Sequence, residues 1–185
     1  MENVVEEIAY RLLESYKIKK PIVNPFDLAN KNGLKIIYFS PSKEEFKDVS
    51  GALDKAKKTI FINKEEPAER QLFTAAHELG HYLLGYKTED VLYRLDSFSN
   101  NDDKQEREAN FFAACLLIPE YMLDDVCREY QFRLRGDEVK LSKIFGVSLS
   151  FMTYRLKHLL RSKIRNTYLE EEIQEGNPFD DEFKC

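Results

Sequence analysis

The stretch from Pro67 to Gly85 reads P-A-E-R-Q-L-F-T-A-A-H-E-L-G-H-Y-L-L-G and contains an H-E-x-x-H motif. Proline suits the first turn of a helix, glycine suits its end, and apolar residues recur between them at helical spacing, so the stretch is predicted to be one helix. Histidines four residues apart lie on the same face of a helix, where both imidazoles can reach one metal ion. The fold is expected to be organised around this helix.

Each polar residue of the motif has a predicted task. His77 and His81 are candidate zinc ligands. Glu78 lies about 100° further round the helix, where it can hold a water molecule at the ion but cannot easily ligate the same ion, so its predicted role is general base. The motif alone does not establish a metal site, because two histidines can also pack within an ordinary core helix or project from it.

A second helical segment, residues 105–119, reads Q-E-R-E-A-N-F-F-A-A-C-L-L-I-P and stops at a proline. A carboxylate from this helix would complete a His, His, Glu site and leave the fourth zinc position for water, as in catalytic rather than structural sites. Glu106 and Asn110 are four residues apart and share a face. Asn110 is therefore predicted to hydrogen-bond the far nitrogen of a ligand histidine and fix its tautomer.

Together the two motifs, H-E-L-G-H-Y-L-L-G and E-R-E-A-N-F-F-A-A-C-L-L-I-P, resemble those of the ImmA/IrrE family of zinc metallopeptidases. The second motif of that family is of the E-x-x-A-N-x-F-A-x-x-L-L-x-P type, and the resemblance covers about residues 1–165. It implies a zinc site organised as in thermolysin-like enzymes, with one Zn²⁺ per chain. It also implies Glu106 rather than Glu108 as the third ligand. It also implies a substrate class, because members of the family commonly act on helix-turn-helix transcriptional repressors in phage, mobile elements or stress responses.

Outside the two motifs, the chain predicts a small sheet and further helices. Two strands at 49–54 and 58–63 form a predicted hairpin that packs on the motif helix. An exposed edge of this hairpin could bind an extended peptide substrate through main-chain hydrogen bonds, and the alternative is a purely structural role. The remaining expected elements are helices at 3–17, 25–32 and 120–130 and a strand at 34–39.

Residues 86–103 lose periodicity and are predicted to form a long loop. Tyr86 and Tyr93 fall within it. They are candidate hydrogen-bond donors to the oxyanion of a tetrahedral intermediate, and the alternative is that they are ordinary core or solvent-facing tyrosines.

Towards the C-terminus, residues 137–145 and 148–160 read as two helices around Gly146 and Val147, which resembles a helix-turn-helix unit. Between Leu134 and Arg165 there are eight Lys or Arg residues and two acidic ones. The resulting local net charge of +6 could bind DNA phosphate. Such a unit can also serve only for packing, and we expect weak DNA binding or none. The predicted division is 1–132 zinc metallopeptidase domain, 133–168 helix-turn-helix-like helical unit, and 169–185 acidic mobile tail.

Composition narrows the class of protein. The chain has 185 residues, of which 43% are apolar and 33% charged, as is ordinary for a soluble globular protein. No stretch is apolar enough to span a membrane, and the acidic first residues lack a signal-peptide core, so a cytoplasmic location is expected. Three cysteines, Cys115, Cys127 and Cys185, show no C-x-x-C spacing and are predicted to be buried free thiols.

The sequence thus predicts an α+β fold: a thermolysin-like mini metallopeptidase domain, with a small sheet packed on the zinc helix, followed by the helix-turn-helix-like unit. The predicted function is a zinc-dependent endopeptidase that cleaves a protein substrate, with a transcriptional repressor as the implied target. The alternative is a DNA-binding or repressor-sequestering regulator with a non-catalytic zinc site. The presence of Glu78, which a purely structural site would not need, favours the enzyme. Neither the scissile bond nor the oligomeric state is predicted.

Overall fold

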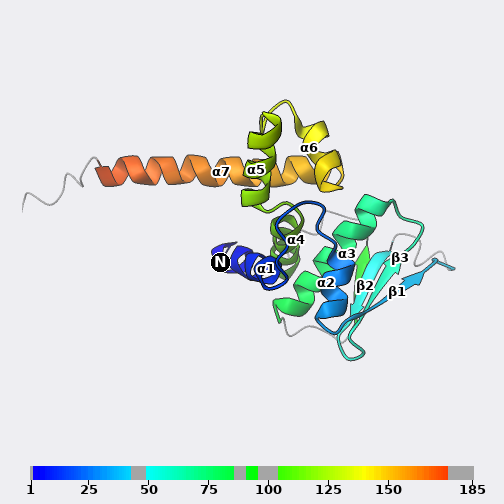
Figure 1. Cartoon of the computed structure of the whole chain (residues 1–185). Helices are drawn as coiled ribbons and strands as arrows, with labels where there is room; N and C mark the ends of the chain where they lie inside the picture. Colours follow the sequence, from blue (N-terminus) through cyan, green and yellow to red (C-terminus); the bar gives the residue numbers. More distant parts are fainter. Residues whose placement is uncertain (1, 43–48, 86–90, 96–103, 175–185) are drawn as a thin grey trace, which may run out of the picture.

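A computed structural model describes residues 2–42, 49–85, 91–95 and 104–174, and of residues 2, 91–95 and 162–174 it describes the backbone alone. The fold is a small mixed α+β arrangement, as predicted (Figure 1). Its elements are α1 (Glu2–Ser15), α2 (Pro25–Lys31), β1 (Lys35–Phe39), β2 (Val49–Asp54), β3 (Thr59–Asn63), α3 (Ala68–Leu83), β4 (Val91–Leu95), α4 (Lys104–Leu117), α5 (Glu120–Tyr130), α6 (Glu138–Phe145) and α7 (Leu149–Gln174).

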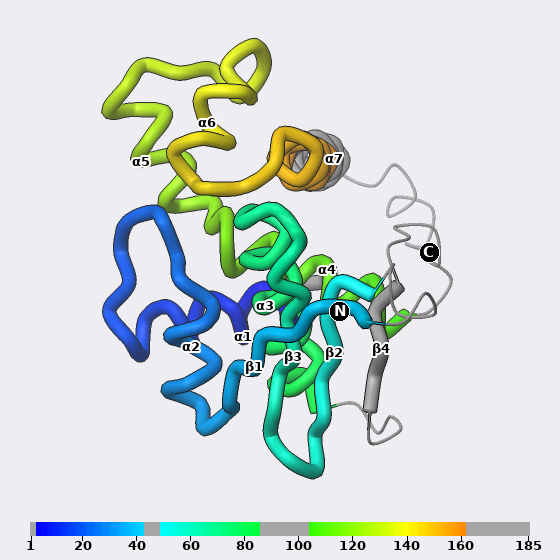
Figure 2. Tube along the Cα trace, turned by 90° about the vertical axis from the view of Figure 1, so that its right-hand side faces the viewer, coloured from blue at the N-terminus to red at the C-terminus, as the bar shows by residue number. Residues whose placement is uncertain are grey.

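The sheet has four strands in the order β1-β3-β2-β4, which can be followed in Figure 2. The predicted hairpin is confirmed, because β2 pairs with β3 in antiparallel fashion, and β1 adds to β3 in parallel. Strand β4 pairs with β2 and lies within the stretch predicted to be a loop, so that prediction was wrong for residues 91–95. Both hairpin strands are therefore internal to the sheet. The hairpin offers no exposed edge for a substrate, and that hypothesis was also wrong.

Helix α3, which carries the H-E-x-x-H motif, lies between the sheet and α4. Its apolar stripe is buried, as shown by Phe73, Ala76 and Leu79. Two glycines allow close approach on its two sides. A Cβ atom on Gly51 of β2 would collide with the side chain of Thr74, and a Cβ atom on Gly80 would lie 2.8 Å from Cδ1 of Phe112 on α4. Because both Cβ atoms are absent, the sheet and α4 pack closely against the motif helix.

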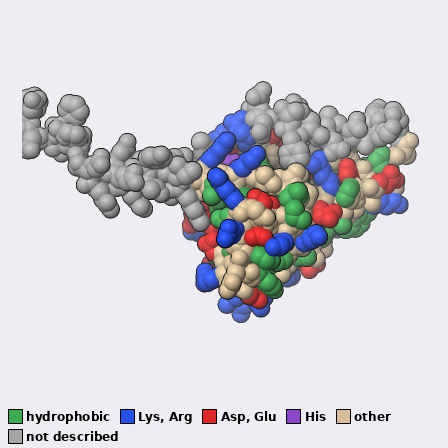
Figure 3. Space-filling model, turned by 90° about the horizontal axis from the view of Figure 1, so that it is seen from above, with side chains coloured by type: hydrophobic (Ala, Val, Ile, Leu, Met, Phe, Trp, Pro, Cys, Tyr) green, Lys and Arg blue, Asp and Glu red, His purple; other side chains and the backbone are tan. Residues whose placement is uncertain are grey.

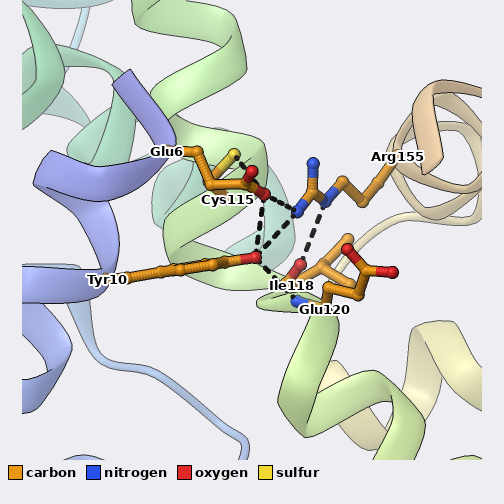
Figure 4. A network of polar contacts seen from close by, with 6 residues as sticks. All are labelled: Glu6, Tyr10, Cys115, Ile118, Glu120 and Arg155. Carbon is orange, nitrogen blue, oxygen red and sulfur yellow. Dashed lines mark hydrogen bonds and ion pairs between the residues drawn. The ribbon is translucent and has the colours of Figure 1, made fainter. Parts of the chain in front are cut away.

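A buried polar network joins the N-terminal helix to the C-terminal one (Figure 4). Arg155 of α7 is 1% exposed, and its Nε donates a hydrogen bond of 3.1 Å to the carbonyl oxygen of Ile118. Its Nη2 lies 3.0 Å from Oε1 of Glu6 and 3.2 Å from Oη of Tyr10, both on α1. The Tyr10 hydroxyl also accepts a hydrogen bond from the backbone N–H of Glu120, and burial raises its pKa. The network holds α1, α5, α7 and the end of α4 together.

The two C-terminal helices form around a glycine turn, as predicted. Gly146 has φ of +66°, a conformation that favours glycine, and the Ser148 hydroxyl accepts a hydrogen bond from the N–H of Phe151 at the start of α7. Helix α7 continues to Gln174, beyond the predicted end at residue 160, so residues 169–174 of the predicted tail are helical. A helix-turn-helix role for this unit stays a prediction.

The basic residues of this unit do not all lie on the surface. Arg155 is buried in the network, and Nζ of Lys140 lies 2.7 Å from Oδ1 of Asp137. On the face seen in Figure 3, Lys and Arg side chains lie among acidic and apolar ones. The local net charge of +6 already counts Asp137, but it includes the buried Arg155, so it overstates by one the charge that this unit can present to DNA.

Two smaller expectations can be compared with the structure. Within the described ranges, no helix combines the length and the apolarity needed to cross a bilayer. Cys115 is a buried thiol and Cys127 a partly buried one, whereas Cys185 lies outside the described residues.

Candidate metal centre

The three predicted ligands meet at one point. His77 and His81 project from α3 and Glu106 projects from α4, and their candidate ligand atoms all lie within 4.8 Å of one another. Nε2 of His77 is 3.3 Å from Oε2 of Glu106, and Nε2 of His81 is 3.0 Å from Oε1 of the same carboxylate. The two Nε2 atoms are 2.9 Å apart. Among the residues that the structure describes, this is the group of three side chains arranged to hold a metal ion.

Asn110 fixes which nitrogen of His77 faces this cluster. Its Oδ1 lies 2.9 Å from Nδ1 of His77. An amide oxygen only accepts hydrogen bonds, so Nδ1 carries the proton and Nε2 of a neutral imidazole presents its lone pair to the other two ligands. Nε2 of His77, Nε2 of His81 and the Glu106 carboxylate then converge on one small volume. A bound cation would satisfy all three, so the donor set fits a metal ion.

The third ligand is a carboxylate anion. Hydrogen bonds from the imidazoles of His77 and His81, which form where their Nε2 atoms carry a proton, hold the pKa of the Glu106 carboxyl well below its usual range. The group is therefore an anion at neutral pH, and a bound cation would take the place of those protons. Glu108 lies apart from the cluster, and its Oε1 is 3.8 Å from Nζ of Lys104. Its side chain is 17% exposed.

Glu78 follows His77 on α3 and is not one of the three clustered ligand side chains. Its side chain is buried at 1% exposure. Its charge interacts with Lys55, a partly buried residue in the turn between β2 and β3. Sequence reasoning missed Lys55, because nothing in the run D-K-A-K-K distinguishes it from Lys57 and Lys58.

Aromatic side chains surround the site on the side of α7. The ring of Phe73 lies 6.0 Å from His77 and 4.6 Å from Phe151, measured between ring centroids. On α7, the ring centroid of His158 lies 5.4 Å from that of Phe111, the residue after Asn110 on α4. Helix α7 therefore packs against both of the helices that carry the ligands.

The two tyrosines proposed as oxyanion donors are not tested by the structure. Tyr86 lies outside the described residues. The backbone of Tyr93 lies in β4 opposite Ala52, and its side chain is outside the described part of the chain.

Residues 29–157 match the family described as the IrrE N-terminal-like domain, which is more than half of the chain. The chain belongs to the ImmA/IrrE family. The resemblance of the two motifs is thereby confirmed. The ImmA/IrrE match extends beyond the ligand helices and takes in α6 and the first part of α7, including Arg155.

Three curated proteins are similar to the chain in sequence. The chain is 29% identical over 123 residues to the "Uncharacterized immunity region protein 2" of Bacillus phage phi105, covering 65% of this chain and 72% of that protein. It is 37% identical over 83 residues to the radiation response metalloprotease IrrE of Deinococcus deserti, covering 43% of this chain and 29% of IrrE. It is 33% identical over 85 residues to the metallopeptidase ImmA of Bacillus subtilis, covering 45% of this chain and 50% of ImmA. The chain thus aligns with half or less of IrrE and ImmA, two relatives that are named as metallopeptidases.

Proposed function

We propose that the protein is a zinc-dependent endopeptidase. The observation that carries this proposal is the convergence of His77, His81 and Glu106, with Glu78 buried beside them. Two neutral imidazoles and one carboxylate are a ligand set of catalytic zinc sites that keep a position for water. A zinc ion held there would supply the Lewis acidity that polarises a peptide carbonyl and lowers the pKa of a water molecule toward about 7.

In this proposal the protein side chains divide the remaining work. Glu78 accepts the proton of the attacking water and delivers it to the leaving amine. Asn110 keeps His77 in the tautomer whose Nε2 can bind the metal. Tyr86 or Tyr93 as the donor to the oxyanion stays a prediction.

The proposed substrate is a transcriptional repressor with a helix-turn-helix domain. Support comes from the resemblance to a family that commonly acts on such regulators, and from relatives named for a phage immunity region and for a radiation response. A second candidate function is a regulator that sequesters a repressor or binds DNA and uses the metal only for structure. The α6–α7 pair, with its glycine turn and nearby basic residues, favours that alternative.

Glu78→Gln separates the two functions. The variant keeps the shape of the side chain but removes the base, so zinc content and repressor binding should persist while cleavage falls by about 10²–10⁴-fold. The measurement mixes zinc-loaded protein with the repressor encoded beside its gene and follows the cut fragments. Wild-type protein should give a discrete cut that a chelator prevents, and the variant should form a stable complex without the cut. If the variant relieves repression in cells as well as wild type does, the protein acts by sequestration.

A further inference from the structure

Helix α7 leaves the rest of the protein part-way along its length. Among its side chains that the structure describes, Leu159 is the last buried one, Leu160 is partly buried and Arg161 is exposed. The backbone continues as a helix to Gln174, and Figure 1 shows this part extending beyond the other labelled helices and strands. Residues 162–174 thus have no described helix or strand of the same chain beside them.

The sequence of this projecting part gives it little helical stability of its own. Asn166, Thr167 and Tyr168 are consecutive residues of low helix propensity. The glutamates at 170–172 lie close to the C-terminal end of α7, where the helix dipole favours cations, and the last turn holds no basic residue. Most helical stability in proteins comes from packing of one face, so a second helix lying along this part would stabilise it.

The charges of the projecting part fall into two blocks of opposite sign. Arg161, Lys163 and Arg165 form a basic block, and the glutamates at 170–172 form an acidic one. No residue of one block lies three or four positions from a residue of the other, so the blocks cannot form the ion pairs that support a single helix. Two antiparallel copies would set each basic block against the acidic block of the other copy, whereas a parallel pair would set like charges together.

We propose that residues 160–174 of α7 pair antiparallel with the same residues of a second copy, so that the protein forms a two-fold symmetric dimer. Lys163 and Glu170 are seven positions apart, a spacing that keeps both on one side of the seam between two paired helices. Arg165 and Glu172 keep to the other side for the same reason. Reversing the second helix brings each basic residue opposite the glutamate of its own side in the other copy, and the symmetry forms each ion pair twice.

The paired region also contains apolar residues. Ile164 and Tyr168 are four positions apart, and this spacing places them on one face of the helix. Two helices of this length make an interface at the low end of the size range for specific association, so we expect a dissociation constant in the micromolar range. The inference concerns assembly and does not depend on the proposed peptidase function.

Sedimentation velocity of the full-length protein over a series of concentrations tests the proposal. Wild-type protein should form a dimer. Lys163→Glu combined with Arg165→Glu sets acidic residues opposite each other and should raise the dissociation constant by more than about tenfold. Adding Glu170→Lys and Glu172→Lys to the same chain makes the opposed charges complementary again, so this fourfold variant should regain the dimer. A parallel pair would keep like charges together in the fourfold variant as in wild type.

Lys143→Glu combined with Lys157→Glu is the matched control, because it changes the net charge equally at two exposed lysines outside the paired region and should leave the dimer intact. Thermal melting of each variant checks that the fold is intact. The inference is overturned if wild-type protein stays monomeric at millimolar concentration, or if the twofold variant at 163 and 165 dimerises as well as wild type. It is also overturned if the fourfold variant stays monomeric, or if the control weakens the dimer equally.

Discussion

A single amide oxygen determines what the ligand cluster can bind. Oδ1 of Asn110 leaves His77 with its proton on Nδ1, so the lone pair on Nε2 faces His81 and Glu106. Without that hydrogen bond, the imidazole could present an N–H to the cluster and lose its capacity as a ligand. Asn110 thus acts on the metal through His77.

At the same scale, the two glutamates of α4 should differ sharply in their effect on the metal. Glu106→Ala removes a ligand and should weaken zinc binding by more than about 100-fold, whereas Glu108→Ala removes a side chain outside the ligand cluster and should change it by less than about threefold. Metal analysis of the purified variants, with a competing chelator, measures both. Retention of zinc by Glu106→Ala, with its loss from Glu108→Ala, would show that the ligand assignment is wrong.

The residues that sequence could identify are those whose relation is local. His77, His81 and the shared face of Glu106 and Asn110 follow from helical spacing alone, and the structure brings all four together. The choice of Glu106 over Glu108 needed the family resemblance. The effect of the Glu78 charge on the pKa of Lys55 could not be found, because it depends on how the turn after β2 lies relative to α3, which no local pattern encodes.

At the scale of elements, the helices and the hairpin could be predicted from periodicity and from turn residues, but the sheet order could not. Strand β4 is short, and its existence depends on pairing with β2, about 40 residues earlier in the chain. That pairing is also what places β2 inside the sheet. This non-local contact explains the missed strand, and together with the pairing of β1 on β3 it explains why neither edge of the hairpin is exposed.

The network at Arg155 should matter for the stability of the element arrangement. Arg155→Leu removes the guanidinium that donates to the Ile118 carbonyl oxygen and pairs with the Glu6 carboxylate, which keeps the Tyr10 hydroxyl as a donor. Because the Glu6 side chain is partly exposed, we expect a loss of about 2–4 kcal/mol. Urea denaturation measures it. Arg161→Leu, at an exposed position on the same helix, is the control and should change stability by less than about 0.5 kcal/mol. Equal stability of the two variants would mean that the network contributes nothing.

At the scale of the whole molecule, charge argues against tight binding to DNA. The chain has a formal net charge of −5, and the burial of Arg155 removes one cation from the helical unit that was expected to be basic. We expect at most weak and strongly salt-dependent association with duplex DNA, without a preferred site. Gel-shift measurements over a range of salt concentrations test this. Nanomolar, sequence-selective binding at physiological salt would contradict it and favour the alternative function.

The contact between Arg155 and Glu6 joins residues that are 149 positions apart in the chain. Helix α1 leaves the ribosome before α7, so Glu6 and Tyr10 lack the Arg155 guanidinium as a partner until α7 has been synthesised. All three candidate metal ligands are synthesised before Arg155. The Arg155 contacts that join α7 to α1 and to the end of α4 can form only after Arg155 has left the ribosome. Closure of this packing therefore waits until the chain has been synthesised past Arg155, so a nascent chain that stops before that residue lacks the final closure of the fold.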